Sequence, residues 1–347
     1  MALISKKKIS FKVNEELLDY LKNQGREVST LKYQDLTRYN SSIALINSQG
    51  EDTLWETVFY PQGELEEIHY NLKSIYTNIQ AHGEMSVIDH LFIERVDVCP
   101  FGNSKPFRIR IVNKMNDNFD YFYVKTADAS RIYGLELEHF ISPNKINYLV
   151  NVDTLIEEHI AGIPGHDFAE TYLKDSDFSR IRIAKEFVKF NERCFFRLLG
   201  DMHSSNFVVD ITPDFEETRY RIRAIDFDQQ SYEGRKNVYM PQFFKQNLPF
   251  VKAGMEVLTS ESMYQYQLEE RSLIRSRIKS AEVFLNSLLT VMSKDEISLP
   301  ENVINLKTEL SKHHKEPKFL KCRNMGEIVM RNLKMLWKSE SLHFKAS

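Results

Sequence analysis

Asp201, Asn206 and Asp226 are the residues whose types and spacing could do chemistry. The first two lie in one short segment, Gly200–Asn206 (GDMHSSN), and the third follows in Ile225–Asp228 (IDFD). A phosphotransferase needs a carboxylate that accepts the proton of the attacking hydroxyl. It also needs an amide oxygen and a second carboxylate to hold the magnesium ion beside the nucleotide phosphates. The pattern predicts phosphoryl transfer, with Asp201 as the base and Asn206 and Asp226 as metal ligands.

The sequence around these residues predicts the elements that position them. Phe207–Val209 and Arg221–Ile225 have strand character, and the polar stretch 210–217 separates them. We expect a hairpin whose two ends bring Asn206 and Asp226 to the same point. The alternative interpretation makes the three polar residues a turn, a cap and a solvated strand end. Their occurrence in this order, bracketed by strands, favours phosphotransfer.

The two segments resemble those of the aminoglycoside phosphotransferase and choline kinase branch of the protein-kinase-like fold. That branch usually has His-Gly-Asp-x-His-x-x-Asn, followed by Ile-Asp-Phe or Ile-Asp-Trp. Here Leu199 replaces the first His, whereas His203 matches the second. For His203 a loop side chain bonded to the backbone is the expectation, rather than a direct chemical role. The resemblance covers roughly residues 90 to 235.

The resemblance implies an α+β, bilobal protein-kinase-like fold, with a small antiparallel β-sheet N-lobe and a mainly helical C-lobe. The expected domains are an N-terminal extension packing on the N-lobe (1–90), the N-lobe and hinge (91–160), and the C-lobe (161–347). The catalytic loop, 199–228, lies in the last of these. An amphipathic helix is predicted at Glu64–Gln80. The sequence of residues 243–338 predicts mainly helices.

The resemblance also implies a phosphate-binding lysine and a glutamate that holds it. Lys125 ends the strand-like run that begins at Tyr121, and a helix is expected at about Ser130–Ile141. Glu136 and Glu138 both lie on that helix. We expect one of them to turn inward and pair with Lys125, with Glu138 preferred because its register matches the family best.

Two further segments are implied to bind the nucleotide. Strand-like runs at 92–98 and 107–112 flank a turn, and the backbone near Gly102, Asn103 and Ser104 is expected to cover the phosphates. A plain β-hairpin turn is the alternative for that loop. The hinge is expected at Glu158, His159 and Ile160, where main-chain groups would bind adenine.

Composition excludes several other classes of protein. The chain has 347 residues, 42% of them hydrophobic, and a net charge of −3, which gives no overall attraction for nucleic acid. No apolar run approaches the about eighteen residues of a membrane helix, and no apolar core follows the N-terminal lysines. The three cysteines are widely spaced, so neither a zinc site nor a disulfide framework is expected. We expect a cytoplasmic protein without membrane contact.

The function predicted from the sequence is therefore an ATP- and Mg²⁺-dependent phosphotransferase that acts on a hydroxyl. A small-molecule acceptor is favoured because the segment after Asp226 is short and lacks the Ala-Pro-Glu motif of protein kinases. The alternatives are a protein kinase or AMP-transferring enzyme of the same fold, and a pseudokinase acting as a binding module. The flanking regions leave room for a protein partner.

Overall fold

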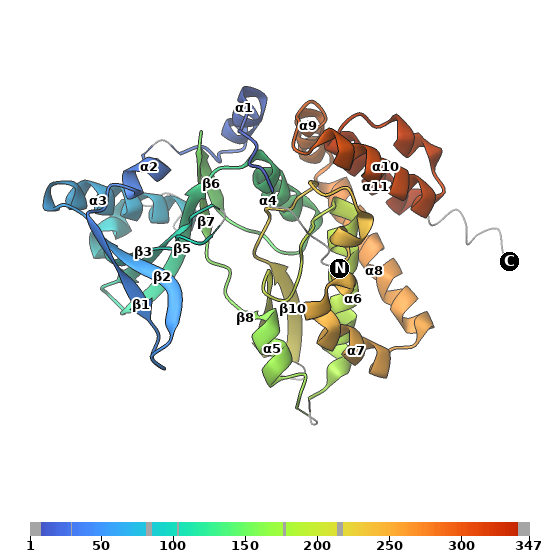
Figure 1. Cartoon of the computed structure of the whole chain (residues 1–347), viewed down its shortest axis with the longest axis horizontal. Coiled ribbons are helices and arrows are strands. Elements are labelled where there is room, and N and C mark those ends of the chain that lie inside the picture. The colour runs from blue at the N-terminus through green and yellow to red at the C-terminus, as the bar shows by residue number, and fades with distance from the viewer. Residues whose placement is uncertain are drawn as a thin grey trace. The chain divides into compact units, whose positions relative to one another are not determined.

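The protein is an α+β chain with an antiparallel sheet and a largely helical second half (Figure 1). The computed structural model describes residues 8–28, 30–80, 85–102, 104–175, 178–213 and 218–338. The chain divides into two compact units. The sheet unit comprises Lys12–Asp128 and Ile146–His159; the helical unit comprises the segment up to Phe11, Ala129–Lys145 and the chain from Ile160 onward.

The sheet unit is built on seven strands in the order β1-β2-β3-β4-β5-β7-β6, with every neighbouring pair antiparallel. The strands are β1 (Ser41–Ile46), β2 (Asp52–Phe59), β3 (Leu91–Val98), β4 (Phe107–Asn113), β5 (Asn118–Thr126), β6 (Tyr148–Asn151) and β7 (Thr154–Glu158). The helices of this unit are α1 (Glu15–Asn23), α2 (Tyr33–Leu36) and α3 (Gln62–Gln80), with a 3₁₀ turn at Met85–His90.

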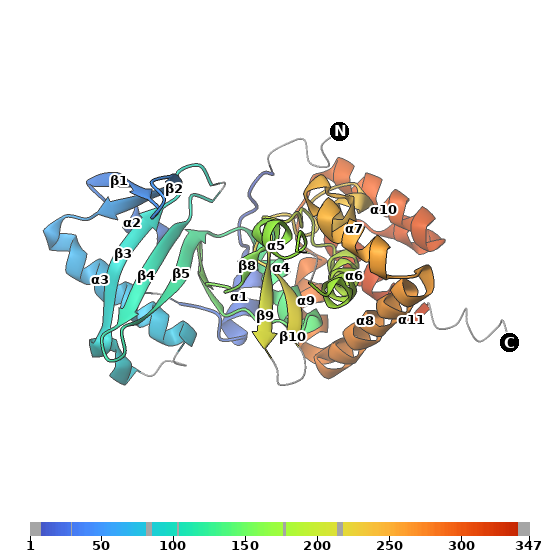
Figure 2. The same cartoon turned by 90° about the horizontal axis from the view of Figure 1, so that it is seen from below.

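Helix α3 covers one face of this sheet (Figure 2). Its buried residues Ile68, Leu72 and Ile75 belong to the same apolar cluster as Ile109 and Phe122 of β4 and β5. Residues that alternate along a strand point to opposite faces, so Ile109 faces the core while Arg108 and Arg110 face the other way. The predicted amphipathic helix is confirmed, and it packs on the sheet as expected.

Residues 1–90 are more than an extension, because β1 and β2 lie in this stretch and are part of the sheet itself. Strand β2 pairs with β3 through Glu56↔Val98 and Thr57↔Asp97. Strands on both sides of residue 90 thus belong to one sheet and one compact unit. The outer strand β1 is largely exposed and lacks the alternation of buried and exposed residues that makes a strand visible in a sequence.

The helical unit contains the remaining elements. Its main helices are α4 (Ala129–Ile141), α5 (Gly165–Thr171), α6 (Arg180–Arg197), α7 (Leu248–Val257), α8 (Ser260–Ser280), α9 (Glu282–Met292), α10 (Pro300–His314) and α11 (Met325–Lys338). A small sheet is formed by β8 (Ile163–Pro164), β9 (Phe207–Pro213) and β10 (Thr218–Ala224). Short 3₁₀ turns lie at Lys236–Tyr239, Pro241–Phe243, Lys245–Asn247 and Pro317–Lys321.

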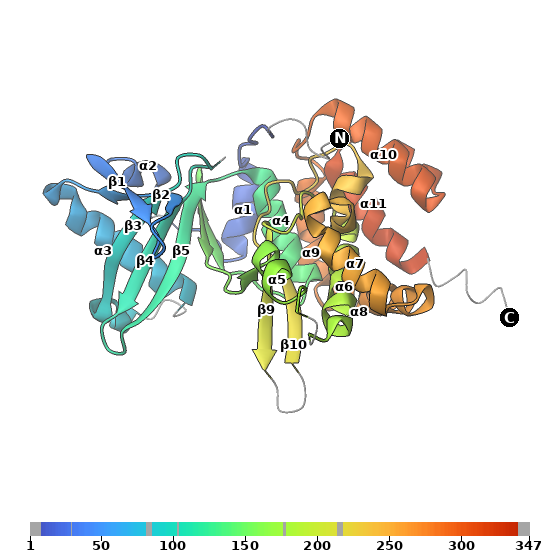
Figure 3. The same ribbon diagram turned by 60° about the horizontal axis from the view of Figure 1, so that its bottom comes forward.

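Helix α6 is the centre of the helical unit and packs against α7, α8, α11 and β10. Phe187, Phe190, Cys194 and Phe195 are buried along it, at the spacing of one helix face. Strands β9 and β10 form the expected hairpin next to this helix (Figure 3). Helix α4 belongs to the helical unit.

In the described part of the chain, no helix is long and apolar enough to cross a membrane. Cys99, Cys194 and Cys322 are free cysteines.

Candidate active site

The segment 198–201 is held by the residues that follow Asp226. Leu198 ends α6 with a left-handed φ of 58°, and Leu199, fully buried, forms a β-bridge with Gln230. The Gly200 amide donates to the Gln229 carbonyl at 3.1 Å. A Cβ on Gly200 would lie 3.0 Å from that same carbonyl oxygen, so the close approach of the two segments favours glycine. Backbone bonds thus support the loop at Leu199 and Gly200.

Asp201 and Asn206 are joined within one tight loop. Asp201 has a φ of 60°, and its carbonyl accepts bonds from the His203 amide at 2.8 Å and from Asn206 Nδ2 at 2.9 Å. Asp and Asn tolerate this left-handed conformation better than most residues. The bond through Nδ2 fixes the Asn206 amide and leaves its Oδ1 as the atom available to a cation. The loop therefore presents a carboxylate and an amide oxygen from its two ends.

Asp226 reaches the same place from β10. The Ile225 amide donates to the Asn206 carbonyl at 3.0 Å, which ties the start of β9 to the segment after β10. Asp226 Oδ1 accepts the Asp228 amide at 3.0 Å and lies 3.5 Å from Arg131 Nη2. The hairpin thus brings Asn206 and Asp226 together, as the sequence predicted.

Negative charge gathers around Asp201. Burial, together with the nearby carboxylates of Asp226, Glu233 and Asp228, raises the pKa of Asp201 to about 7. Burial also raises the pKa of Glu233 above its ordinary value. Carboxylates this close disfavour one another's ionised form, and a bound cation would relieve that repulsion.

Arg131 of α4 supplies part of the balancing positive charge. Its side chain is 4% exposed, and its Nε donates to Asp228 Oδ1 at 2.8 Å. Asp228 is therefore held by an ion pair with Arg131. Asp226 stays 35% exposed in its side chain and is within reach of a small ion.

A magnesium ion fits these residues, although the donor set is small. In the described ranges, no group of three or more His, Cys, Asp or Glu is arranged to hold a metal. Mg²⁺, however, is usually held by one or two carboxylates together with waters and substrate phosphates. Asn206, with its amide oriented, and Asp226, with its carboxylate accessible, meet that smaller requirement.

Lys125 and Glu138 each have a partner other than the one expected. Lys125 forms an ion pair with Glu157 of β7, and their side chains are 12% and 7% exposed. Glu138 forms an ion pair with Arg197 at the end of α6, and both side chains are almost fully buried. Each of the two residues thus has a partner inside its own unit, and the Lys125–Glu138 pair stays a prediction. Glu136, also on α4, is buried.

The turn after β3 does not offer all the amides that phosphate binding would need. The Gly102 amide donates to the Cys99 carbonyl at 3.3 Å, and the Lys105 amide donates to the Gly102 carbonyl at 3.0 Å. A Cβ on Gly102 would lie 2.7 Å from Pro106 Cδ, so the turn itself requires glycine. Asn103 lies outside the described residues. Among the three residues expected to cover the phosphates, Ser104 is therefore the one for which the prediction is left standing.

The expected hinge uses its amides within the sheet. The Glu158 amide donates to the Asn147 carbonyl at 3.0 Å, and the His159 amide donates to the Tyr121 carbonyl at 3.2 Å. These two donors are therefore engaged within the sheet unit, and adenine binding by the main chain at 158–160 stays a prediction. Ile160 is 8% exposed and begins the next stretch of the helical unit.

The side chain of His203 accepts the Ser205 amide at 3.3 Å, which confirms its expected role in the loop. Its Nε2 lies 3.9 Å from Asp201 Oδ1. Burial lowers the pKa of His203 below its ordinary value. This histidine therefore orders the loop between the two candidate functional residues.

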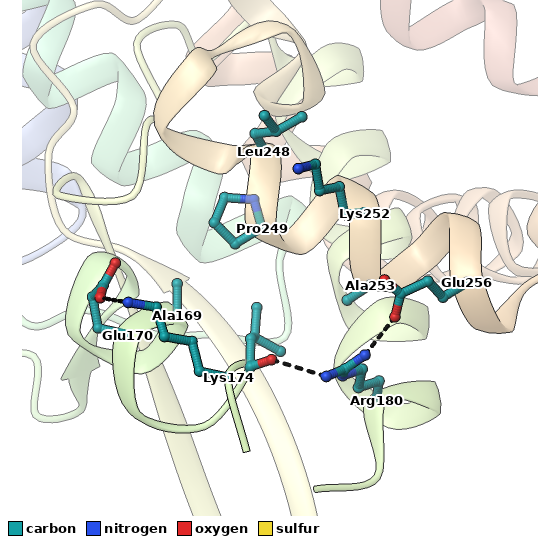
Figure 4. A pocket seen from close by; sticks show the side chains of 10 residues that line it. Ala169, Glu170, Lys174, Arg180, Leu248, Pro249, Lys252, Ala253 and Glu256 are labelled. Carbon is teal, nitrogen blue, oxygen red and sulfur yellow. Dashed lines mark hydrogen bonds and ion pairs between the residues drawn. The ribbon is translucent and has the colours of Figure 1, made fainter. Parts of the chain in front are cut away.

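A pocket of about 240 Å³ in the helical unit lies between α5 and α7, away from these residues (Figure 4). Its charged side chains are mostly paired: Lys174 with Glu170, and Arg180 with Glu256 at 2.5 Å. Asp201, Asn206 and Asp226 are not part of its lining.

Sequence reasoning missed Arg131, Glu157 and Glu233 as members of the charged surroundings. Glu157 follows from the β5–β7 pairing, which sets Tyr123 opposite Glu157 and so places Lys125 diagonal to it. Arg131 could have been predicted to lie near Asp226 and Asp228, because an arginine that becomes buried needs carboxylate partners and these two residues supply them. Nothing in the sequence around Glu233 signals its proximity to Asp201.

A scan against models of known protein families and a search of the curated proteins both find no match for this chain.

Proposed function

We propose that the protein is an ATP- and Mg²⁺-dependent phosphotransferase of the protein-kinase-like fold. The observation that carries the proposal is the bonded loop that joins Asp201, Asn206 and Asp226. The Asn206 side chain is fixed on Asp201, and the Asn206 carbonyl is fixed on the segment of Asp226. If Asp201, Asn206 and Asp226 were only a turn, a cap and a strand end, they would not need to converge in this way. Nor would a carboxylate need to be buried between them.

Asp201 is the proposed base. As the acceptor hydroxyl attacks, its oxygen bonds to the γ-phosphorus, its proton passes to Asp201, and the bond to the β,γ-bridging oxygen breaks to release ADP. A pKa of about 7 suits this task, because a base works best when its pKa lies near the working pH. Magnesium, when bound, would neutralise charge on the phosphate oxygens. Lys125, held by Glu157, would contribute a further positive charge to the nucleotide.

The segment after Asp226 supports a small acceptor. Ser298 Oγ and Asn302 Nδ2 donate to the Tyr232 carbonyl, the second at 2.9 Å, and the Lys236 amide donates to Glu309 at 2.8 Å. These bonds tie the segment to α10 and its preceding loop. A short, fixed segment offers little surface on which an extended peptide could lie. A small hydroxylated molecule does not need such a surface.

A catalytically inactive binding module of the same fold is the second candidate. Two observations favour it: the Glu158 and His159 amides are bonded within the sheet, and Glu138 pairs with Arg197. This candidate keeps the architecture but predicts no phosphoryl transfer. The test must therefore separate nucleotide binding from turnover.

The thermal midpoint with and without Mg-ATP tests the proposal, because a ligand that binds only the folded state raises it. We expect a magnesium-dependent rise that is lost in Asp226→Asn and kept in Asp89→Asn, a matched change at an exposed site of the sheet unit. ADP release with a panel of hydroxylated acceptors then tests turnover. No rise at millimolar Mg-ATP would contradict the proposal, and a rise without turnover would favour the binding module.

A further inference from the structure

Positive charge is concentrated in the last helices of the helical unit. From Lys307 to Lys338, where every residue is described, the chain has nine Lys and Arg residues and three Glu residues. The whole chain, by contrast, has a net charge of −3. The segment comprises most of α10, the 3₁₀ turn Pro317–Lys321 and α11, and α10 packs against both of the others (Figure 1).

A pocket of about 300 Å³ lies in this segment, between the 3₁₀ turn and α11. Four cationic side chains line it, and we call it the cationic pocket. They are Lys318 and Lys321 of the turn and Arg331 and Lys334 of α11. Arg331 is half-buried, whereas the three lysines are exposed.

The spacing of these residues explains why they converge. Lys318 and Lys321 are three apart in a 3₁₀ turn, in which residues at this spacing eclipse one another. Arg331 and Lys334 are three apart in α11 and share one face of that helix. Like charges at this spacing are destabilising, and an anion held between the two pairs would offset their repulsion.

The carboxylates closest to the cationic pocket are balanced by cations from outside its lining. Glu327, which belongs to the lining, forms an ion pair with Arg323 at 2.5 Å. Glu316 forms an ion pair with Lys338 at 3.0 Å, and its other oxygen accepts the Lys318 amide at 3.2 Å. Neither Arg323 nor Lys338 lines the pocket.

The remaining acidic side chains of this part of the sequence do not supply the missing negative charge. Glu309 accepts the Lys236 amide at 2.8 Å. The sequence after Lys338 contains one acidic side chain, Glu340, and one lysine, Lys345, which offset each other. The positive excess therefore holds for all side chains from Lys307 onward, those outside the described residues included.

The cationic pocket and the outer end of the β9–β10 hairpin lie at opposite ends of α6. Thr218, at the start of β10, accepts a bond from Arg182 near the beginning of α6. Helix α11 donates from Asn332 to the Phe195 carbonyl near the other end of α6. At 1.5 Å per residue these two points of α6 are roughly 20 Å apart.

The pocket between α5 and α7 provides a contrast within the same unit (Figure 4). There Lys174 pairs with Glu170 and Arg180 pairs with Glu256, and all four side chains belong to the lining. Its ion pairs are thus internal, whereas the one carboxylate that lines the cationic pocket is neutralised from outside.

We propose that the cationic pocket binds the phosphate or diphosphate group of a small phosphorylated molecule. The guanidinium of Arg331 can donate two parallel hydrogen bonds to a phosphate, and the lysines add point charges. The volume lies at the lower end of the range of small-molecule sites. None of the described residues that line the pocket is aromatic, whereas a site for single-stranded nucleic acid stacks bases on aromatic rings.

The cationic pocket is distinct from the candidate active site, because Asp201, Asn206 and Asp226 are not part of its lining. Binding there can therefore be tested without phosphotransfer. In EDTA no magnesium supports binding of an anion at Asp226, so failure of the proposed phosphotransferase activity would leave this test unaffected.

The test is calorimetric titration of the full chain with inorganic pyrophosphate in EDTA. We expect one site, weakened by salt, with at least a tenfold loss of affinity in the double variant Arg331→Gln/Lys334→Gln. The matched control Lys312→Gln/Lys315→Gln removes two exposed cations of the same segment outside the lining and should change affinity by less than twofold. Asp226→Asn should bind as the wild type does.

Circular dichroism and the thermal midpoint show whether the α11 variant is folded. If it is not, Lys318→Gln/Lys321→Gln removes the two exposed lysines of the turn and is used instead. Equal losses in pocket and control variants would overturn the proposal, because affinity would then follow total charge. Absence of binding at millimolar pyrophosphate would also overturn it.

A second arm distinguishes the source of the phosphate group. The protein is sedimented with phosphatidylcholine vesicles that contain or lack phosphatidic acid. Sedimentation that needs phosphatidic acid, and that pyrophosphate and the pocket variants abolish, would assign the phosphate to a lipid headgroup. Pyrophosphate binding without such sedimentation would assign it to a soluble molecule, which is the result we expect.

Discussion

Glu138 of α4 and Arg197 of α6 form an ion pair that is almost fully buried. Their side chains are 2% and 1% exposed, and burial lowers the pKa of Arg197 to about 9. Arg197 directly precedes the segment Leu198–Asp201, and its carbonyl accepts a bond from Gln230 Nε2 at 2.6 Å. The pair therefore fixes the end of α6, from which the candidate catalytic loop begins.

Breaking this pair from either side should destabilise the protein. Arg197→Met or Glu138→Met leaves the remaining charge buried without its partner, which typically costs about 3–5 kcal/mol of the free energy of unfolding. The double variant removes both charges and should be more stable than either single variant. Urea unfolding of the four proteins measures the coupling. Additive losses would show that the two side chains do not stabilise each other.

Gly200 should not tolerate a side chain. Gly200→Ala places a Cβ 3.0 Å from both the Gln229 oxygen and Val238 Cγ1, so the two segments must separate. We expect a loss of about 1–3 kcal/mol, the usual cost of overpacking, together with loss of any Mg-ATP response.

Gly254→Ala is the control for this change. Gly254 lies in α7 with no atom within 4 Å of the added Cβ, so the variant should gain about 0.5–1 kcal/mol from better helix propensity. Thermal unfolding compares the two variants. A Gly200→Ala protein as stable as the wild type would contradict the close approach of the two segments.

The local elements could be predicted from the sequence because their signals are local. The alternation in β10, the apolar stripe of α6 and the glycine before Asp201 each depend on neighbouring residues. The partner of Lys125 depends on long-range register, because β5 pairs with β7 and β6 lies beyond it. Glu136 and Glu138 are both buried, so burial does not distinguish between them. The pairing of Glu138 with Arg197 was not predicted, since the last turn of a helix gave no sign of burial.

Lys125→Met should have two separable effects. The Glu157 side chain is 7% exposed, so loss of this ion pair should destabilise the sheet unit by about 2–4 kcal/mol. If Lys125 also binds phosphate, the rise in thermal midpoint with Mg-ATP should disappear. The double variant Lys125→Met/Glu157→Gln should recover much of the stability without recovering the ATP response. Recovery of both would assign the lysine a structural role alone.

The stability of the C-terminal helices should depend on pH through His314. Its ring stacks on Phe319 and its Nε2 lies 2.8 Å from Asn332 Oδ1. Burial, with a smaller contribution from neighbouring His313, lowers the pKa of His314 to about 4 from its ordinary 6.5. The folded state therefore keeps the ring neutral where the unfolded chain already binds a proton. The contribution to stability is complete above about pH 6.5 and is lost as the pH falls toward 4.

Urea unfolding at pH 7.5 and 4.5 measures this contribution against His314→Gln, which cannot take up a proton. Between the two pH values the wild type should lose on the order of 1–3 kcal/mol more than the variant. His90→Gln, at an exposed histidine of the sheet unit, is the control and should follow the wild type. Other titrating groups are common to all three proteins and cancel in the comparison. Parallel pH profiles for wild type and His314→Gln would mean that His314 is protonated equally in the folded and unfolded states.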